Sequence, residues 1–223
     1  MEWRLFEGIP SGDVRAVVAL ARRRRFARGE VVFHRGDPAD TVHLVVKGRF
    51  DVRVTTRFGD VVALGICGPG DAFGELALVT GGRRSATVSA LEPAETLSLR
   101  RDALERLTRE LPSVNVALVR LLAQQVERLS QLLVEAHTVD ADARVARRLL
   151  ELASVYGSAA SAAEVPLTQE AIAGLAGTSR ATVNRVLRGL ERDGAVRLRR
   201  GRTVVADVEA LERLAGRERD ARG

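Results

Sequence analysis

Short β-branched runs recur between residues 28 and 99, and they constrain the fold of this chain more than any other feature. The runs read EVVFH, TVHLVVKG, FDVRVTT, VVALGICG and ATVSAL, and glycine-bearing turns separate them. Strands that recur at this spacing are typical of an antiparallel sandwich or barrel. The stretch VHLVV is apolar at nearly every position, so we expect it to pack in the interior.

A helix is predicted ahead of these strands, in the segment SGDVRAVVALARRRR. Ser11 or Asp13 is expected to cap it, because both residue types accept hydrogen bonds from backbone N–H groups at a helix N-terminus. We interpret the arginine run 22–25 as the solvated end of this helix, since runs of like charge are usually solvated.

The pattern changes to a helical one between Arg101 and His137. RDALERLTREL predicts a short helix, and Pro112 marks a break or a new first turn. Apolar residues then follow one another at spacings of three, four, three, four and three positions. They are Val119, Leu122, Val126, Leu129, Leu133 and Ala136. This is the a/d spacing of a coiled coil, and we call these six residues the seam.

The seam is shorter than three heptads, so a helix packed on its own domain is the alternative interpretation. Leu118, Leu121 and Leu132 widen the apolar surface enough to cover both a domain and a partner helix. We therefore predict a parallel homodimer formed through this helix.

Composition excludes several function classes. A single cysteine, Cys67, rules out an internal disulfide framework and a multi-cysteine metal site. The histidines His34, His43 and His137 lack metal-ligand spacing, so we expect no metal site and no enzyme. No apolar run is long enough to span a bilayer and no signal-peptide pattern is found, which favours a cytoplasmic protein. The net charge of +6 is a hint of a polyanionic partner.

The C-terminal part is predicted to be a helix, a tight turn, a second helix and a two-stranded wing. ADARVARRLLELASVYG is an amphipathic helix that ends at Gly157, and the loop SAASAAEVP follows it. Thr168 and Ser179 are expected to cap the two later helices, and Gly177 permits the turn between them. The second helix has a predicted buried stripe at Val183, Val186, Leu187 and Leu190.

The opposite face of that helix carries arginines and no acid. Its residues are Arg180, Ala181, Asn184, Arg185 and Arg188. Residues 168–206 contain eight arginines and three acidic residues, a net charge of +5. Arginine can donate to both O6 and N7 of guanine in the major groove, so the pattern predicts DNA binding. A three-helix unit with a solvated basic face is the alternative.

The order of these segments resembles the cyclic AMP receptor protein and fumarate–nitrate regulator superfamily of bacterial transcription factors. PGDAFGELAL…RRSATV is similar to its phosphate-binding cassette, and LTQEAIAGLAGTSRATVNRVLRGLERDGAVRL to its helix-turn-helix. The resemblance covers almost the whole chain and implies an α+β fold. The implied domains are an antiparallel β jelly-roll of the cyclic-nucleotide-binding type (1–110), a dimerisation helix (111–138) and a winged helix-turn-helix (139–223).

The resemblance implies an effector site that takes cyclic AMP or a related cyclic nucleotide, with no obligatory cofactor. The implied effector-binding residues are Gly74, Glu75, Leu76, Arg84, Ser85, Leu129 and Ser130. FGEL would form a short helix in which Gly74 lets the backbone approach the ligand. Glu75 would accept from a ribose hydroxyl, and Arg84 would neutralise the phosphate, with Ser85 as a further donor. A structural ion pair between Glu75 and Arg84 is the alternative.

Two positions depart from the family pattern. Nucleotide-responsive members place a Thr-Ser or Thr-Asn pair on the long helix, whereas this chain has Leu129 and Ser130 there. Leu129 removes one hydroxyl and joins the seam, which leaves room for cyclic GMP, for altered affinity, or for a protein already held active by a tighter seam. Ala181 replaces a glutamate that would accept from cytosine, so we expect a half-site that keeps two guanine contacts and is relaxed or changed between them.

The resemblance also implies the DNA-contacting residues. They are Thr168, Gln169, Ser179, Arg180, Ala181, Thr182, Asn184, Arg185, Arg188, Arg200 and Arg202. We predict a homodimeric regulator that binds a palindromic operator and meets RNA polymerase, with no membrane partner. A ligand-independent regulator with a vestigial effector pocket is the alternative.

Overall fold

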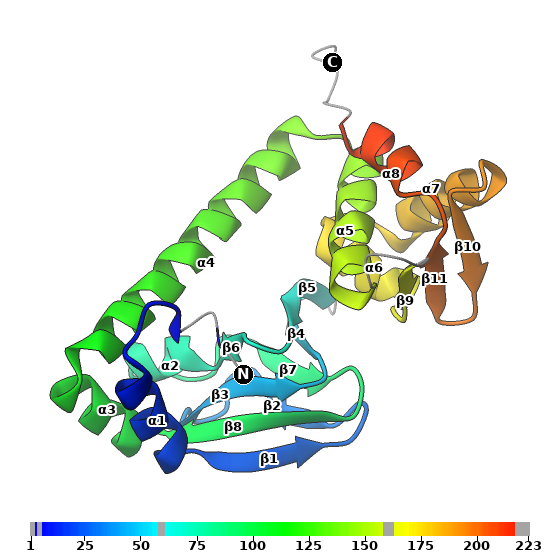
Figure 1. Ribbon diagram of the computed structural model, residues 1–223. Coiled ribbons are helices and arrows are strands. Elements are labelled where there is room, and N and C mark those ends of the chain that lie inside the picture. Colours follow the sequence, from blue (N-terminus) through cyan, green and yellow to red (C-terminus); the bar gives the residue numbers. More distant parts are fainter. Residues whose placement is uncertain (1–2, 4–5, 58–60, 158–162, 217–223) are drawn as a thin grey trace. The chain divides into compact units, whose positions relative to one another are not determined.

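The computed structural model describes residue 3 and residues 6–57, 61–157 and 163–216. The chain divides into two compact units, Met1–Glu127 and Arg128–Gly223, which are described separately below. Figure 1 labels the helices and strands of each unit. Among the described residues, no helix combines the length and the apolar character that a membrane span requires.

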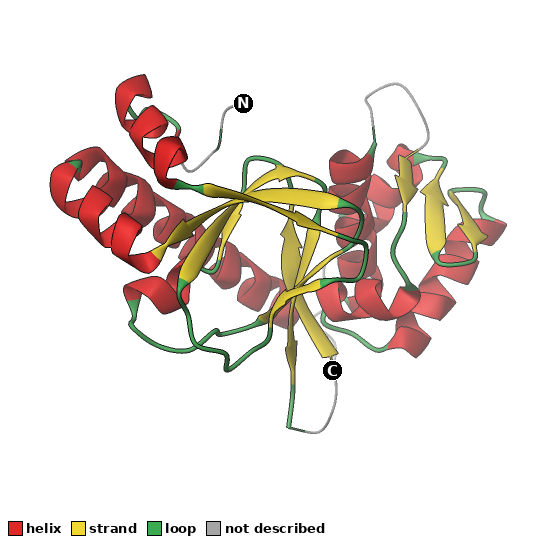
Figure 2. Cartoon of the chain, turned by 90° about the horizontal axis from the view of Figure 1, so that it is seen from below, coloured by secondary structure: helices red, strands yellow, loops and turns green. Residues whose placement is uncertain are grey.

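Two antiparallel sheets form the body of the first unit, and their strands are yellow in Figure 2. The first sheet has the order β1 (Arg22–Phe26), β8 (Ala94–Arg100), β3 (Thr41–Lys47) and β6 (Ala72–Phe73). The second sheet has the order β2 (Val31–Phe33), β7 (Thr87–Ala90), β4 (Phe50–Thr55) and β5 (Val61–Cys67). These pairings confirm the predicted antiparallel β jelly-roll.

Alternation along β3 separates two cores. Val45 belongs to a buried cluster with Phe26 and Phe73 of the first sheet and Phe50 and Val88 of the second, so this core lies between the sheets. Val42 and Leu44 belong to another cluster, which contains residues of α1 (Ser11–Leu20), α3 (Arg101–Glu110) and α4 (Pro112–Thr138). Because side chains in a strand alternate between its faces, the near-continuous apolar run VHLVV supplies both cores.

The interpretation of the arginine run as a helix end is wrong. Helix α1 ends at Leu20, and Arg22–Arg25 belong to β1, which pairs with β8. Arg23 and Arg25 each donate to Glu95 of β8, at 2.5 and 3.0 Å, and these ion pairs favour the extended run. No described side chain caps α1 at its N-cap residue Pro10. The two predicted caps have other partners, since Ser11 accepts from Arg15 and Asp13 accepts from Ser113.

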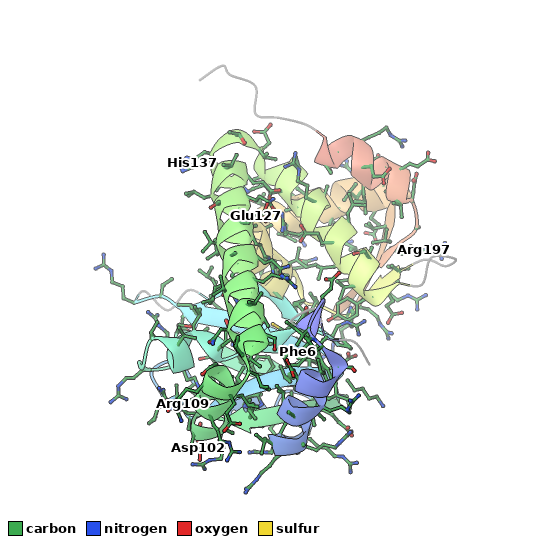
Figure 3. All side chains as sticks on the ribbon, turned by 60° about the vertical axis from the view of Figure 1, so that its left-hand side comes forward. Phe6, Asp102, Arg109, Glu127, His137 and Arg197 are labelled. Atoms are coloured by element: carbon green, nitrogen blue, oxygen red, sulfur yellow. The ribbon has the colours of Figure 1, made fainter. Side chains whose placement is uncertain are left out.

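Helix α4 begins at Pro112, which confirms the prediction that this proline marks a new first turn. Near its start, Val114 and Ala117 are buried, and Leu118 and Leu121 pack against the outer core. The seam lies on a different strip of the helix: Val119, Val126, Leu129 and Leu133 are 57–67% exposed, whereas Leu122 is half-buried. Figure 3 draws the side chains along this helix, with Glu127 and His137 labelled. Most of the seam is therefore not covered by the described part of the chain.

The second unit contains the predicted helix-turn-helix. Its elements are α5 (Ala141–Tyr156), β9 (Ala163–Val165), α6 (Gln169–Ala176), α7 (Arg180–Arg192), β10 (Val196–Arg199), β11 (Arg202–Val205) and α8 (Val208–Ala215). Helix α5 carries a wholly buried stripe that includes Val145 and Leu149, which places it in the core of this unit.

The wing differs from the prediction. In the described part of the chain it is a three-stranded sheet of order β10–β11–β9, not a hairpin of two strands. Of the predicted loop 158–166, residues 158–162 lie outside the described residues. Ala163 and Val165 are buried and pair with Val205 and Thr203 of β11. Alternate burial of two small apolar residues on an edge strand is too short a signal to distinguish from a loop.

Candidate functional sites

The FGEL motif forms the predicted short helix, α2 (Glu75–Val79), directly after β6. Gly74 is its N-cap and has a φ of +88°, in the left-handed region that favours glycine. A Cβ atom at this position would lie 2.5 Å from Nη1 of Arg84 and 3.2 Å from the carbonyl oxygen of Thr41. Gly74 is therefore required both by its backbone conformation and by the close approach of Arg84.

Arg84 lies inside the first unit, with only 3% of its surface exposed. Nη1 donates to the carbonyl oxygens of Thr41 at 2.7 Å and Gly74 at 3.0 Å, and Nη2 donates to Oγ1 of Thr41 at 2.9 Å. The guanidinium lies over the ring of Phe33, 4.0 Å from its centroid. Burial lowers the pKa of Arg84, and Asp40 at 3.5 Å acts in the opposite direction. Its Nε is buried without a hydrogen-bond partner among the described residues.

Glu75 is the acidic counterpart and is 2% exposed. Its Oε1 accepts from Nε2 of Gln125 on α4 at 2.7 Å. Its Oε2 is buried and has no hydrogen-bond partner among the described residues. Burial raises the pKa of Glu75, and hydrogen bonds together with the charge of Arg84 offset part of this rise. No ion pair joins Glu75 to Arg84 among the described contacts, so the structural ion-pair interpretation has no support.

The other predicted effector residues differ in their surroundings. Leu76 directly follows Glu75 and Ser85 directly follows Arg84, and both are exposed. Leu129 and Ser130 are exposed residues of α4 that belong to the second unit. The structure thus brings Gly74, Glu75 and Arg84 together, and a role for Leu129 and Ser130 stays a prediction.

A polar network behind Arg84 was not predicted from the sequence. Nε2 of His43 lies 3.3 Å from Oγ1 of Thr41, which accepts from Arg84, and Nδ1 lies 3.0 Å from Oγ1 of Thr96. The imidazole stacks on Phe73 with 5.1 Å between ring centroids. Burial, followed by the charge of Arg84, lowers the pKa of His43 to about 3. The imidazole is therefore neutral at physiological pH, and it adds no second positive charge beside Arg84.

The turn between α6 and α7 has the predicted local structure. Oγ1 of Thr168 accepts from the backbone N–H of Ala171 at 3.2 Å, and Oγ of Ser179 accepts from that of Thr182 at 3.1 Å. Gly177 has a φ of +58°. The predicted stripe on α7 is buried, and Arg180, Ala181, Asn184, Arg185 and Arg188 are all exposed. The predictions for the two faces of α7 are confirmed.

Several of the exposed residues predicted to contact DNA already have acidic or polar partners. Both Nη atoms of Arg185 donate to the carboxylate of Asp142 on α5, at 2.8 and 2.5 Å. Asn184 donates to Gln169 at 3.0 Å. Arg188 pairs with Glu191, one turn further along α7, and Arg202 pairs with Glu164 of β9. The sequence pattern gave no sign of the Asp142 contact, because the two residues lie 43 positions apart.

A groove of about 400 Å³ lies between the start of the helix-turn-helix and the wing. Its polar lining consists of Thr168, Gln169, Glu170, Arg180, Arg199, Arg202 and Thr203. Figure 3 labels a further wing arginine, Arg197 of β10. Four of the predicted DNA-contacting residues thus line one concave surface. Among the described residues, no group of His, Cys, Asp or Glu side chains could hold a metal ion.

Comparison with known proteins assigns the family. Residues 23–110 match the model of the cyclic nucleotide-binding domain, and residues 143–214 match that of the Crp-like helix-turn-helix domain. The chain is 32% identical over 214 residues to the CRP-like cAMP-activated global transcriptional regulator of Mycobacterium tuberculosis, covering 95% of this chain and 96% of that protein. It is 36% identical to the cyclic AMP receptor protein of Thermus thermophilus, with the same coverage of both chains.

A solved structure of a CRP-family transcriptional regulator from Thermus thermophilus is also similar. Its TM-score is 0.75 at 31% identity, over 87% of this chain and 97% of that one. The chain belongs to the CRP/FNR family of transcription regulators, and it is not an enzyme. This assignment confirms the fold class and the resemblance inferred from the sequence.

Proposed function

We propose that the protein is a homodimeric, sequence-specific DNA-binding regulator whose activity is controlled by a cyclic nucleotide, with cyclic AMP as the effector. The observation that carries the effector proposal is the pair of unpartnered buried groups, Oε2 of Glu75 and Nε of Arg84. Buried polar atoms without partners are rare, and one acceptor beside one cationic donor suits a ligand that offers a hydroxyl and a phosphate.

Each group of the site has one role in this proposal. Oε2 of Glu75 accepts from a ribose hydroxyl, and Arg84 binds the cyclic phosphate through the N–H donors that its internal hydrogen bonds do not use, Nε foremost. Gly74 keeps the backbone clear of the guanidinium, and the exposed hydroxyl of Ser85 adds a donor. The names of the relatives in Mycobacterium tuberculosis and Thermus thermophilus support cyclic AMP.

The long helix is the proposed route from effector to DNA. Gln125 of α4 donates to the same carboxylate that would accept the ribose hydroxyl. A ligand that changes the charge distribution on Glu75 therefore acts on α4 directly, and α4 continues into the second unit. Ser130 keeps one hydroxyl on this helix, while Leu129 extends the seam. Such coupling is typically a few kcal/mol, so that partial activity without effector is expected.

The exposed seam supports the homodimer. Val126, Leu129 and Leu133 are each more than half exposed in the single chain. A row of apolar side chains at a/d spacing on an exposed helix suits a second copy of the same helix. We place the domain limits at 1–110, 111–138 and 139–223, with the middle segment as the dimerisation helix.

The basic face of α7 is the proposed reader of DNA sequence. Two copies in a homodimer would present it to successive major grooves about 34 Å apart on a palindrome. Arg180 and Arg185 would contact guanines, and Arg200 and Arg202 would contact phosphates. Such a regulator works in the cytoplasm and meets RNA polymerase at its promoters.

A titration of the purified chain with cyclic AMP and cyclic GMP tests the proposal. Calorimetry measures effector binding, and a duplex selected from random sequence by the chain itself measures DNA affinity in the presence and absence of effector. We expect cyclic AMP to release or absorb heat and to raise the affinity for the selected duplex. Neither heat nor a change in DNA affinity with either nucleotide would favour the ligand-independent regulator instead.

A further inference from the structure

The ion pair between Arg185 and Asp142 joins two helices of the second unit. Arg185 lies on α7 and donates through both Nη atoms to the two carboxylate oxygens of Asp142. Asp142 lies in the first turn of α5, where the helix dipole stabilises a carboxylate. Its side chain is 37% exposed, against 64% for that of Arg185. The shorter, less exposed partner therefore fixes the position of the longer one.

The geometry of the pair decides which donors Arg185 retains. The end-on arrangement uses one N–H group from each Nη atom. A guanidinium has five N–H donors, so the edge formed by Nε and the neighbouring Nη keeps two parallel donors. O6 and N7 of guanine accept two parallel donors of this kind. Arg185 can therefore read a guanine while it remains bonded to Asp142.

Attraction to phosphates follows a different rule. It depends on net charge, is independent of sequence and dominates non-specific binding. The carboxylate of Asp142 cancels most of the charge that Arg185 would otherwise present to the DNA backbone. An unpaired Arg185 could also turn toward a phosphate in any sequence, whereas the bonded side chain cannot do so without losing two charge-assisted hydrogen bonds.

We propose that Asp142 is a specificity-determining residue of the DNA-binding face, which holds Arg185 as a reader of base edges and prevents it from acting as a general phosphate-binding cation. This inference rests on the proposed function, in which α7 enters the major groove. Asp142 is a positioning residue in this account, because it acts through Arg185 and has no base contact of its own.

The test compares two duplexes of equal length and composition. One carries the palindrome selected by the wild-type chain, and the other carries the same bases in scrambled order. The full-length chain is used with cyclic AMP present. Asp142→Asn removes the charge with little change in shape. We expect affinity for the scrambled duplex to rise about three- to tenfold and to depend more steeply on salt, by close to one released counterion. Affinity for the palindrome should rise less, so that the ratio of the two affinities falls.

Two further variants separate the mechanism from a general charge effect. Glu209→Gln removes the same charge from an exposed glutamate of α8, 3.9 Å from Arg213, and should leave the ratio unchanged. In an Arg185→Ala background, Asp142→Asn should shift both affinities alike and again leave the ratio unchanged. If Asp142→Asn lowers the ratio of the two affinities as much in the Arg185→Ala background as in the wild-type background, the effect comes from the charge of Asp142 alone. This result would overturn the proposal.

The outcomes also distinguish this inference from the function on which it rests. A wild-type chain that selects no duplex over random competitor refutes the proposed DNA reading, and the inference falls with it. A selective wild-type chain whose ratio is the same in Asp142→Asn refutes the inference alone. A folded Asp142→Asn chain that discriminates better than wild type refutes it as well.

Discussion

Substituting Gly74 by alanine should separate two costs that coincide at this position. A positive φ costs a residue other than glycine about 1–2 kcal/mol. The new Cβ would also lie 2.5 Å from Nη1 of Arg84, so the guanidinium must move. Nη1 donates to two backbone oxygens, and the loss of one hydrogen bond to a charged group costs about 1.5–3 kcal/mol. The sum predicts that Gly74→Ala lowers the free energy of unfolding by about 2.5–5 kcal/mol.

Gly81→Ala is the matched control. Gly81 has a φ of +69°, and no heavy atom lies within 4 Å of the position that its Cβ would take. This variant carries the backbone cost alone, about 1–2 kcal/mol. Denaturant unfolding of both variants measures the difference without any assumption about the effector, and calorimetry with cyclic AMP then gives the affinities. We expect affinity to fall at least tenfold in Gly74→Ala and to change little in Gly81→Ala. Equal losses of stability in the two variants would refute the packing argument.

Three other predictions address acid stability, assembly and DNA contacts. Folding lowers the pKa of His43 from 6.5 to about 3. The contribution of neutral His43 to the free energy of unfolding is therefore complete above pH 6.5, and it is lost as the pH falls toward about 3. Between pH 7 and 5, the free energy of unfolding should fall by up to about 1.4 kcal/mol per pH unit because of this residue. The His43→Gln variant should lose this pH dependence, and the control variant His34→Gln, at an exposed histidine, should keep it. Leu133→Glu should convert the proposed homodimer to a monomer in sedimentation equilibrium, because burial of each leucine in the seam contributes about 1.5–3 kcal/mol; a persistent dimer would place the interface elsewhere. Arg180→Ala should cost about 1–3 kcal/mol on the selected duplex and relax base preference at one position. Arg200→Ala should instead weaken binding to every sequence alike and flatten its salt dependence.

Local signals in the sequence predicted the helix-turn-helix well. Thr168 and Ser179 cap their helices and Gly177 adopts the left-handed conformation, because each of these requirements involves residues only a few positions apart. The arginine run 22–25 was misassigned for the opposite reason. Four consecutive arginines have no strand-like alternation, and the carboxylate that pairs with two of them, Glu95, lies about 70 positions away in the sequence.

In the candidate effector site, too, the local features could be predicted from the sequence and the long-range contacts could not. Gly74, Glu75 and Arg84 could be predicted because they lie in one short motif whose chemistry is recognisable. Thr41 and Gln125 could not, since each reaches the site from a separate element through tertiary packing. His43 was visible in the sequence only as one polar residue in an apolar strand. Its role beside Thr41 depends on the pairing of β3 with β8, which brings Thr96 to its other ring nitrogen.

These internal contacts govern how strongly any effector can bind at the site. Both N–H groups of Nη1 of Arg84, one N–H group of its Nη2 and one oxygen of Glu75 are already engaged within the protein, so an effector that needs these groups must break existing bonds. The net gain from such an exchange is small, because a bond lost offsets the bond formed. Nε of Arg84 and Oε2 of Glu75 require no exchange, since they have no described partner. Much of the affinity for a cyclic nucleotide should therefore depend on these two atoms. Arg84→Lys, which keeps the charge and loses the Nε donor, should then bind cyclic AMP nearly as weakly as Arg84→Ala; recovery of wild-type affinity in the lysine variant would show that charge alone suffices.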